Sequence, residues 1–152
     1  MQIMSNKNFM LKPVDILLVE DNPGDVLLTE EAFLQAKIKS NIHVAEDGEI
    51  ALKMLRQEGE YNAAILPDII LLDLNLPKKD GREVLQEIKA DDFLKKIPVV
   101  ILTSSQAEQD ITKSYNLHAN SYIIKPVNLE RFGEIVQAIE NFWFSIVALP
   151  NN

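Results

Sequence analysis

A regular alternation of short apolar segments with longer segments of helical periodicity constrains the fold of this chain most. The apolar segments are short and mostly uniform, as is typical of strands covered on both faces. They occupy residues 15–20, 41–46, 68–73, 97–103 and 121–125. The segments between and after them place apolar residues at helical spacing and occupy residues 22–37, 47–59, 81–90, 107–118 and 128–146. This alternation predicts a parallel sheet with helices on both faces.

The number of these units selects one fold class. Five strand–helix units favour an α/β, flavodoxin-like, doubly wound five-stranded parallel sheet with strand order 2-1-3-4-5 and an extended C-terminal helix. The segment at 41–46 is the least apolar, and we expect it at an edge of the sheet. The length of 152 residues is most simply one domain. We expect an N-terminal arm at 1–12, the domain at 13–146 and a C-terminal tail at 147–152.

Composition excludes several classes of function. The net charge of −8 disfavours direct binding to nucleic acid, whose phosphates would repel the surface. No apolar run approaches the ~20 residues that span a bilayer, and the first residues lack the apolar core of a signal peptide. Zero cysteines exclude disulfides, thiolate metal sites and a cysteine nucleophile. We therefore expect a cytoplasmic protein without membrane or nucleic-acid partners.

Acidic residues end two of the predicted strands. Glu20 and Asp21 follow the first apolar run, and Asp73 ends the third. In such sheets ligands bind beyond the carboxyl ends of the strands, at the switch point between strands one and three. The three carboxylates should converge there and repel one another unless a cation is present. A site of few carboxylates that leaves room for water and phosphate oxygens suits Mg²⁺.

The last two predicted strands end in a hydroxyl and an ammonium group. Thr103 ends the fourth strand and Lys125 the fifth. Together with the acids they form a site for a phosphoryl group, because phosphoryl transfer depends mostly on positioning and charge neutralisation. Each residue alone has a simpler interpretation as a helix cap, a loop carboxylate or a surface lysine. Capping does not explain the lysine, so the combined pattern favours the phosphoryl site.

Four motifs resemble the receiver domains of two-component response regulators, and the resemblance covers roughly residues 13–144. They are VED at 19–21, LLDLNLPKKDG at 71–81, ILTSS at 101–105 and YIIKP at 122–126. The resemblance implies that a histidine kinase phosphorylates Asp73 and that Mg²⁺ is the cofactor. It further implies the following roles: Glu20, Asp21, Asp73 and the backbone carbonyl of Asn75 as metal ligands, Thr103 and Lys125 as phosphoryl-binding residues, and Tyr122 as a rotating switch.

Three further stretches are similar to the small single-domain regulators of cyanobacterial phytochrome histidine kinases. They are LNLPKKDGREVL at 74–85, EGEY at 58–61 and ENFWFSIVALP at 140–150. This resemblance implies a phytochrome-type kinase as the partner. With no output domain after the receiver, we expect signalling through protein–protein contact.

Three alternatives compete with the receiver interpretation. The first is a Mg²⁺-dependent phosphatase with an aspartyl nucleophile, which tends to carry a second acid two residues after it. That position is Asn75, whose amide cannot exchange protons, so we expect a phosphoacceptor with slow autodephosphorylation and no true enzyme activity. The second is a pseudo-receiver that is never phosphorylated, which the complete residue set argues against. The third is a flavodoxin-type cofactor carrier, but Pro-Gly-Asp follows strand one where a Ser/Thr-rich phosphate cradle would stand.

The predicted C-terminal helix carries more aromatic surface than one sheet can cover. An apolar seam of spacing four and three can face the sheet. Phe142, Trp143 and Phe144 are consecutive and project around most of the helix, so at least one must lie elsewhere. Exposed aromatic residues mark contact sites. We predict an isologous homodimer through this helix and strand five. The alternatives are folding back onto the domain or contact with the kinase.

Overall fold

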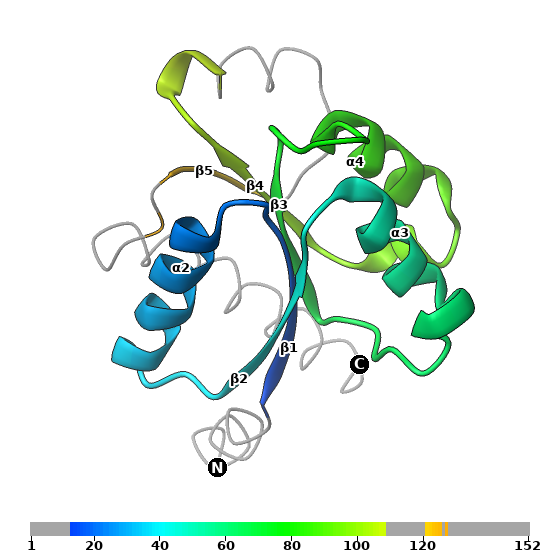
Figure 1. Ribbon diagram of the computed structural model, residues 1–152, viewed down its shortest axis with the longest axis horizontal. Helices are drawn as coiled ribbons and strands as arrows, with labels where there is room; N and C mark the ends of the chain where they lie inside the picture. Colours follow the sequence, from blue (N-terminus) through cyan, green and yellow to red (C-terminus); the bar gives the residue numbers. More distant parts are fainter. Residues whose placement is uncertain (1–12, 109–120, 126, 128–152) are drawn as a thin grey trace, which may run out of the picture.

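The structure, a computed structural model, describes residues 13–108, 121–125 and 127, and is built on a parallel five-stranded sheet. The strands lie in the order β2-β1-β3-β4-β5, and every neighbouring pair is parallel (Figure 1). The predicted order is confirmed, and β2 lies at an edge as expected. The bounds are β1 Val14–Val19, β2 Ser40–Ala45, β3 Ile69–Asp73, β4 Val99–Thr103 and β5 Ser121–Ile124.

Helices cover both faces of the sheet. Figure 1 shows α2 on one face and α3 with α4 on the other, which confirms the doubly wound arrangement. The bounds are α2 Pro23–Gln35, α3 Gly48–Arg56 and α4 Gly81–Ala90, with short 3₁₀ turns η1 Gly59–Tyr61 and η2 Leu94–Lys96. None of the described helices is long and apolar enough to cross a membrane. The N-terminal arm, the helix predicted at 128–146 and Phe142, Trp143 and Phe144 lie outside the described residues, as does most of the helix predicted at 107–118.

Two apolar cores lie on the two faces of the sheet. Side chains alternate along β1, so that Leu17 belongs to the core under α3 and α4, while Ile16 and Leu18 join Phe33 of α2. All five residues of β3 are buried in the same alternating way. Burial on both faces holds β1 and β3 in place and fixes where the residues that end them project.

The helices α2, α3 and α4 each begin at the carboxyl edge of the sheet with a side-chain cap. The Asn22 side chain accepts a hydrogen bond from the backbone N–H of Asp25, which starts α2 as the Asn-Pro sequence predicts. Asp47 caps α3 and Asp80 caps α4 in the same way. These caps turn the chain from strand to helix within a few residues. The positive ends of the helix dipoles therefore lie near the predicted crevice.

Close contact at Gly81 places the start of α4 against the end of β3. A Cβ atom at position 81 would lie 2.4 Å from the carbonyl oxygen of Asp73 and 2.6 Å from the Cα atom of Leu74. The Gly81 N–H also donates a 3.0 Å hydrogen bond to the Leu74 carbonyl. Only glycine leaves the space for this contact, so residue 81 helps to fix the backbone that carries Asp73.

Candidate functional site

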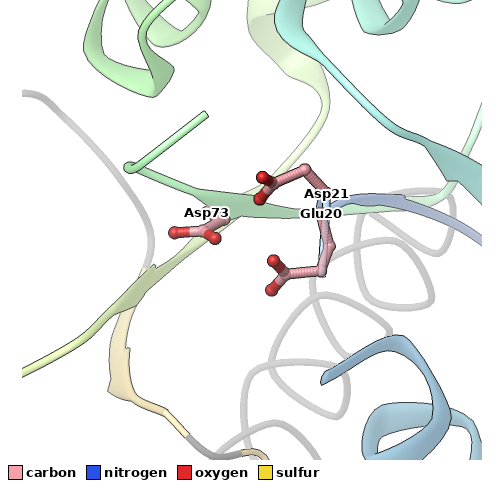
Figure 2. Close-up of side chains that lie close together, drawn as sticks. All are labelled: Glu20, Asp21 and Asp73. Carbon is pink, nitrogen blue, oxygen red and sulfur yellow. The ribbon is translucent and has the colours of Figure 1, made fainter. Parts of the chain in front are cut away.

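The three strand-end acids meet at the carboxyl edge of the sheet. Ligand atoms of Glu20, Asp21 and Asp73 all lie within 4.8 Å of one another, and Figure 2 shows the three carboxylates at the ends of β1 and β3. Glu20 is 2% exposed and Asp73 is 1% exposed, whereas Asp21 is exposed. The pairing of β1 with β3 brings these residues together, at the place that the switch-point rule predicts.

Lys125 is the cation of this cluster. Its Nζ atom lies 2.9 Å from Asp73 Oδ2, 3.0 Å from Glu20 Oε1 and 2.9 Å from an oxygen of Asp25. The Lys125 N–H donates a 2.7 Å hydrogen bond to the Thr103 carbonyl, which ties the end of β5 to the end of β4. Burial lowers the pKa of Lys125, but the hydrogen bonds to the three carboxylates outweigh it and raise the pKa above its usual value. The ammonium group is therefore firmly charged.

Asp25 is a member of the site that the sequence did not reveal. It lies in the first turn of α2, and its carboxylate is a third anionic partner of Lys125. An acid in the first turn of a helix is common because it interacts favourably with the helix dipole. Because the helix dipole alone explains an acid at this position, the sequence does not indicate that Asp25 also contacts Lys125.

One lysine does not neutralise the buried acids. Burial raises the pKa of Glu20, the neighbouring Asp73 raises it further, and Lys125 opposes both, so that it stands at about 7. Four carboxylates, those of Glu20, Asp21, Asp25 and Asp73, lie around a single ammonium group, so the site carries excess negative charge. The donor set consists of carboxylate oxygens, the ligands that hard divalent cations prefer. The residues present therefore fit a bound divalent metal ion.

Of the other predicted residues, Asn75 contacts Asp73 directly, while Thr103 and Tyr122 lie on the neighbouring strands β4 and β5. The backbone N–H of Asn75 donates a 3.0 Å hydrogen bond to Asp73 Oδ1. Thr103 is fully buried at the end of β4, and its hydroxyl contacts the carbonyls of Ser105 and Ile123 at 3.4 and 3.5 Å. Both distances are at the limit for a hydrogen bond, so the hydroxyl is weakly held. Tyr122 is half-buried on β5, against the core under α3 and α4.

Glu108 is a second residue near Asp73 that no sequence motif indicates. Its carboxylate accepts a 2.9 Å hydrogen bond from the backbone N–H of Ser104 and a 3.0 Å hydrogen bond from the side chain of Asn75. Partial burial raises the pKa of Glu108, but these hydrogen bonds outweigh it and lower the pKa below its usual value. The charged carboxylate thus joins the loop after β3 to the loop after β4.

Comparison with known proteins gives a consistent result. The family described as the response regulator receiver domain matches residues 16–139. Response regulator Rcp1 of Synechocystis sp. is 49% identical over 138 residues, which cover 91% of this chain and 94% of Rcp1.

Two solved structures are similar as well. The structure of the phosphorylated cyanobacterial phytochrome response regulator RcpA has 52% identity and a TM-score of 0.73, over 89% of this chain and 96% of RcpA. The Mn²⁺-bound form of Rcp1 has 50% identity and a TM-score of 0.72, over 86% of this chain and 94% of that chain. The fold, the acidic cluster and these matches together show that the chain belongs to the response regulator receiver domain family.

Proposed function

We propose that this protein is a single-domain response regulator that accepts a phosphoryl group from a histidine kinase onto Asp73. The observation that carries the proposal is a buried aspartate at the switch point, contacted by Lys125 and clustered with Glu20 and Asp21. The match over 94% of Rcp1 supports a regulator that consists of the receiver alone. Receiver domains are signalling proteins, so the phosphorylated state is the output rather than a catalytic intermediate.

The transfer requires only groups that surround Asp73. A carboxylate oxygen of Asp73 attacks the phosphorus of the kinase phosphohistidine and forms a P–O bond. The P–N bond breaks, and its electron pair returns to the imidazole nitrogen. Lys125 is placed to neutralise charge on the phosphoryl group. Glu20, Asp21 and Asp73, with the backbone carbonyl of Asn75, would hold Mg²⁺, which supplies charge neutralisation at the phosphoryl oxygens when bound.

The phosphoryl group should stay on Asp73 and be hydrolysed only slowly. Asn75 stands where an aspartyl phosphatase would carry a second acid, and an amide cannot act as a general base. A phosphoryl group adds about 1.5 to 2 negative charges and several acceptor oxygens. The weakly held Thr103 hydroxyl turns to donate to one of them, and the Tyr122 ring moves into the space that it leaves.

The proposed phosphodonor is a phytochrome-type histidine kinase, and the proposed assembly is a homodimer. The phytochrome response regulators among the similar proteins support a phytochrome-type histidine kinase as the phosphodonor. We place the protein in the cytoplasm, where ATP is available to such a kinase. Output passes through protein contact, with a homodimer formed by the C-terminal helix and β5 through Phe142, Trp143 and Phe144.

Phosphotransfer from a labelled kinase tests the proposal. A histidine kinase carrying ³²P-phosphohistidine should transfer its label to the wild-type protein in the presence of Mg²⁺. Asp73→Asn preserves the size of the side chain but removes the nucleophile, so labelling should be lost. Asp80→Asn is the matched control, because asparagine also caps α4 and labelling should remain. A chelator should stop transfer and added Mg²⁺ should restore it; undiminished labelling of Asp73→Asn would refute the assignment.

A further inference from the structure

Glu108 joins two loops at the carboxyl edge of the sheet, next to the proposed phosphoacceptor. One carboxylate oxygen, Oε1, accepts the Ser104 N–H at 2.9 Å, and the other, Oε2, accepts the Asn75 side-chain amide at 3.0 Å. Ser105 caps the same helical turn, because its hydroxyl accepts the Glu108 N–H at 3.2 Å. This third contact fixes the backbone of Glu108, from which its carboxylate extends to Asn75 and Ser104.

Both groups that Glu108 contacts follow strands at the edge of the sheet where Asp73 lies, Asn75 after β3 and Ser104 after the paired strand β4. Asn75 donates its own backbone N–H to Asp73 Oδ1, so a single residue connects the two carboxylates. Ser104 supplies the first backbone amide beyond Thr103, at the carboxyl end of β4. Free amides at this edge of a parallel sheet are natural donors to anions. Here the Ser104 amide already has an anionic acceptor.

We propose that Glu108 is a positioning residue that competes with the incoming phosphoryl group for the donors beside Asp73 and so slows phosphorylation. The proposal rests on the function proposed above for Asp73. A carboxylate offers the same kind of anionic oxygen acceptors as a phosphoryl group, so the Ser104 N–H and the Asn75 amide can serve either one. Binding of the phosphoryl group therefore requires the bridge to open.

The negative charge of Glu108 and the limited access to Asp73 should both slow phosphorylation. A phosphoryl group on Asp73 is strongly anionic, and the Glu108 carboxylate stays beside it whether or not the bridge opens. Asp73 is 1% exposed, so a phosphodonor reaches it only when neighbouring groups move. Opening the contact between Asn75 and Glu108 frees the loop that follows β3. Removal of the Glu108 charge should therefore speed the reaction.

Acetyl phosphate is the probe that tests this inference, because it needs no kinase contact. A carboxylate oxygen of Asp73 attacks its phosphorus, the P–O bond to the acetyl group breaks, and acetate leaves with the electron pair. Glu108→Gln keeps the shape and removes the charge. The initial rate of ³²P incorporation should rise about fivefold at low ionic strength, the upper end expected for a half-exposed charge. The initial rate for Glu108→Ala, which also removes the acceptor oxygens, should rise at least as much.

Two controls separate this role from a general effect of charge or structure. Glu58→Gln removes an exposed charge just after the end of α3, and its rate should equal that of the wild type. The advantage of Glu108→Gln should shrink at about 1 M salt, where the Debye length falls to about 3 Å. A purely structural effect would not depend on salt in this way.

The outcomes distinguish the inference from the function on which it rests. If the wild type is labelled at Asp73 and both Glu108 variants match its rate, the role of Glu108 is refuted while the phosphoacceptor stands. If acetyl phosphate and the kinase both fail to label the wild type, the proposed function itself is wrong. Faster labelling of the Glu108 variants alone, with the expected salt dependence, supports the inference.

Discussion

Glu20 and Asp73 are buried acids that both contact the Lys125 ammonium group. Glu20 is 2% exposed, and its pKa stands at about 7 because burial and Asp73 together outweigh Lys125. The folded protein therefore binds a proton at Glu20 more tightly than the unfolded chain, whose glutamate has its usual value near 4.5. At neutral pH the metal-free site is a source of instability.

Stability of the metal-free protein should fall as pH rises through this window. From about pH 4.5 to 7 the unfolded chain has lost the Glu20 proton while the folded protein keeps it, so unfolding releases a proton. The free energy of unfolding should drop by up to about 3 kcal/mol from this group and then level off. Denaturant unfolding in a chelator at pH 5, 6, 7 and 8 measures the change.

Glu20→Gln is the matched control for this pH dependence. The glutamine has no proton to lose, so the drop in stability over the same window should largely disappear. Saturating Mg²⁺ should stabilise the wild type more at pH 8 than at pH 5.5, because it binds the ionised carboxylate. Equal pH slopes for the wild type and Glu20→Gln would show that Glu20 is not the group that titrates.

Residues of the site differ in how far the sequence can predict them. Glu20, Asp21, Asp73 and Lys125 end strands, and strand ends meet at one edge of a parallel sheet, so their convergence follows from the alternating pattern. Asp25 and Glu108 lie in first helical turns, where acids are common because they interact favourably with the helix dipole. Their contacts depend on side-chain reach across two loops, which no spacing in the sequence encodes.

At the scale of elements, β3 and α4 work as one unit that presents Asp73. The strand is buried along its whole length, and α4 begins against its last residue through Gly81. The Asp80 cap and the Gly81 N–H hold the connecting loop between them. The position of Asp73 therefore depends on the space at residue 81 as well as on the strand.

Gly81→Ala should destabilise the protein and disturb the site. The added methyl group would lie 2.4 Å from the Asp73 carbonyl oxygen, so the backbone must shift. Forced overpacking of this kind costs about 1–3 kcal/mol, measurable by denaturant unfolding. Gly24→Ala in the first turn of α2 is the control, because its nearest neighbour lies 3.1 Å away and is a side-chain atom. Equal stability of Gly81→Ala and the wild type would contradict the role given to Gly81.

Element boundaries show where sequence prediction reached its limit. The prediction of the helix at 81–90 is confirmed, because its apolar residues keep helical spacing along the whole of α4. The helix predicted at 47–59 ends earlier, at Arg56, where Gln57 adopts a left-handed conformation with φ of 56°. Glycine usually takes that position, so a glutamine there does not mark a helix end in the sequence. Local backbone geometry at Gln57 has no sequence signal.

At the scale of the whole molecule, the strand order could be predicted because the alternation leaves few topologies. Parallel strands joined by helices, with right-handed crossovers, favour this order at this chain length. The oligomeric state could not be predicted in the same way, because contact with a second copy of the protein produces no periodic pattern in the sequence. The dimer is inferred only from the three consecutive aromatic residues near the C-terminus.

Sedimentation at micromolar concentration tests the proposed homodimer. Phe142→Ala and Trp143→Ala should each weaken association, because large buried aromatic side chains dominate such interfaces. Phe93→Ala removes an aromatic ring that is 65% exposed at the start of η2, outside the proposed contact residues, and it should leave association unchanged. A protein that sediments as a monomer both with and without phosphorylation would refute the dimer.

Mapping of the phosphoryl group tests the assignment of Asp73 as the phosphoacceptor. The protein is phosphorylated with Mg²⁺, the acyl phosphate is trapped by borohydride reduction, and mass spectrometry locates the reduced residue. We predict a single modified site at Asp73, with no modification when a chelator replaces Mg²⁺. Modification at another residue, or an unmodified Asp73 in a protein that has taken up phosphate, would contradict it.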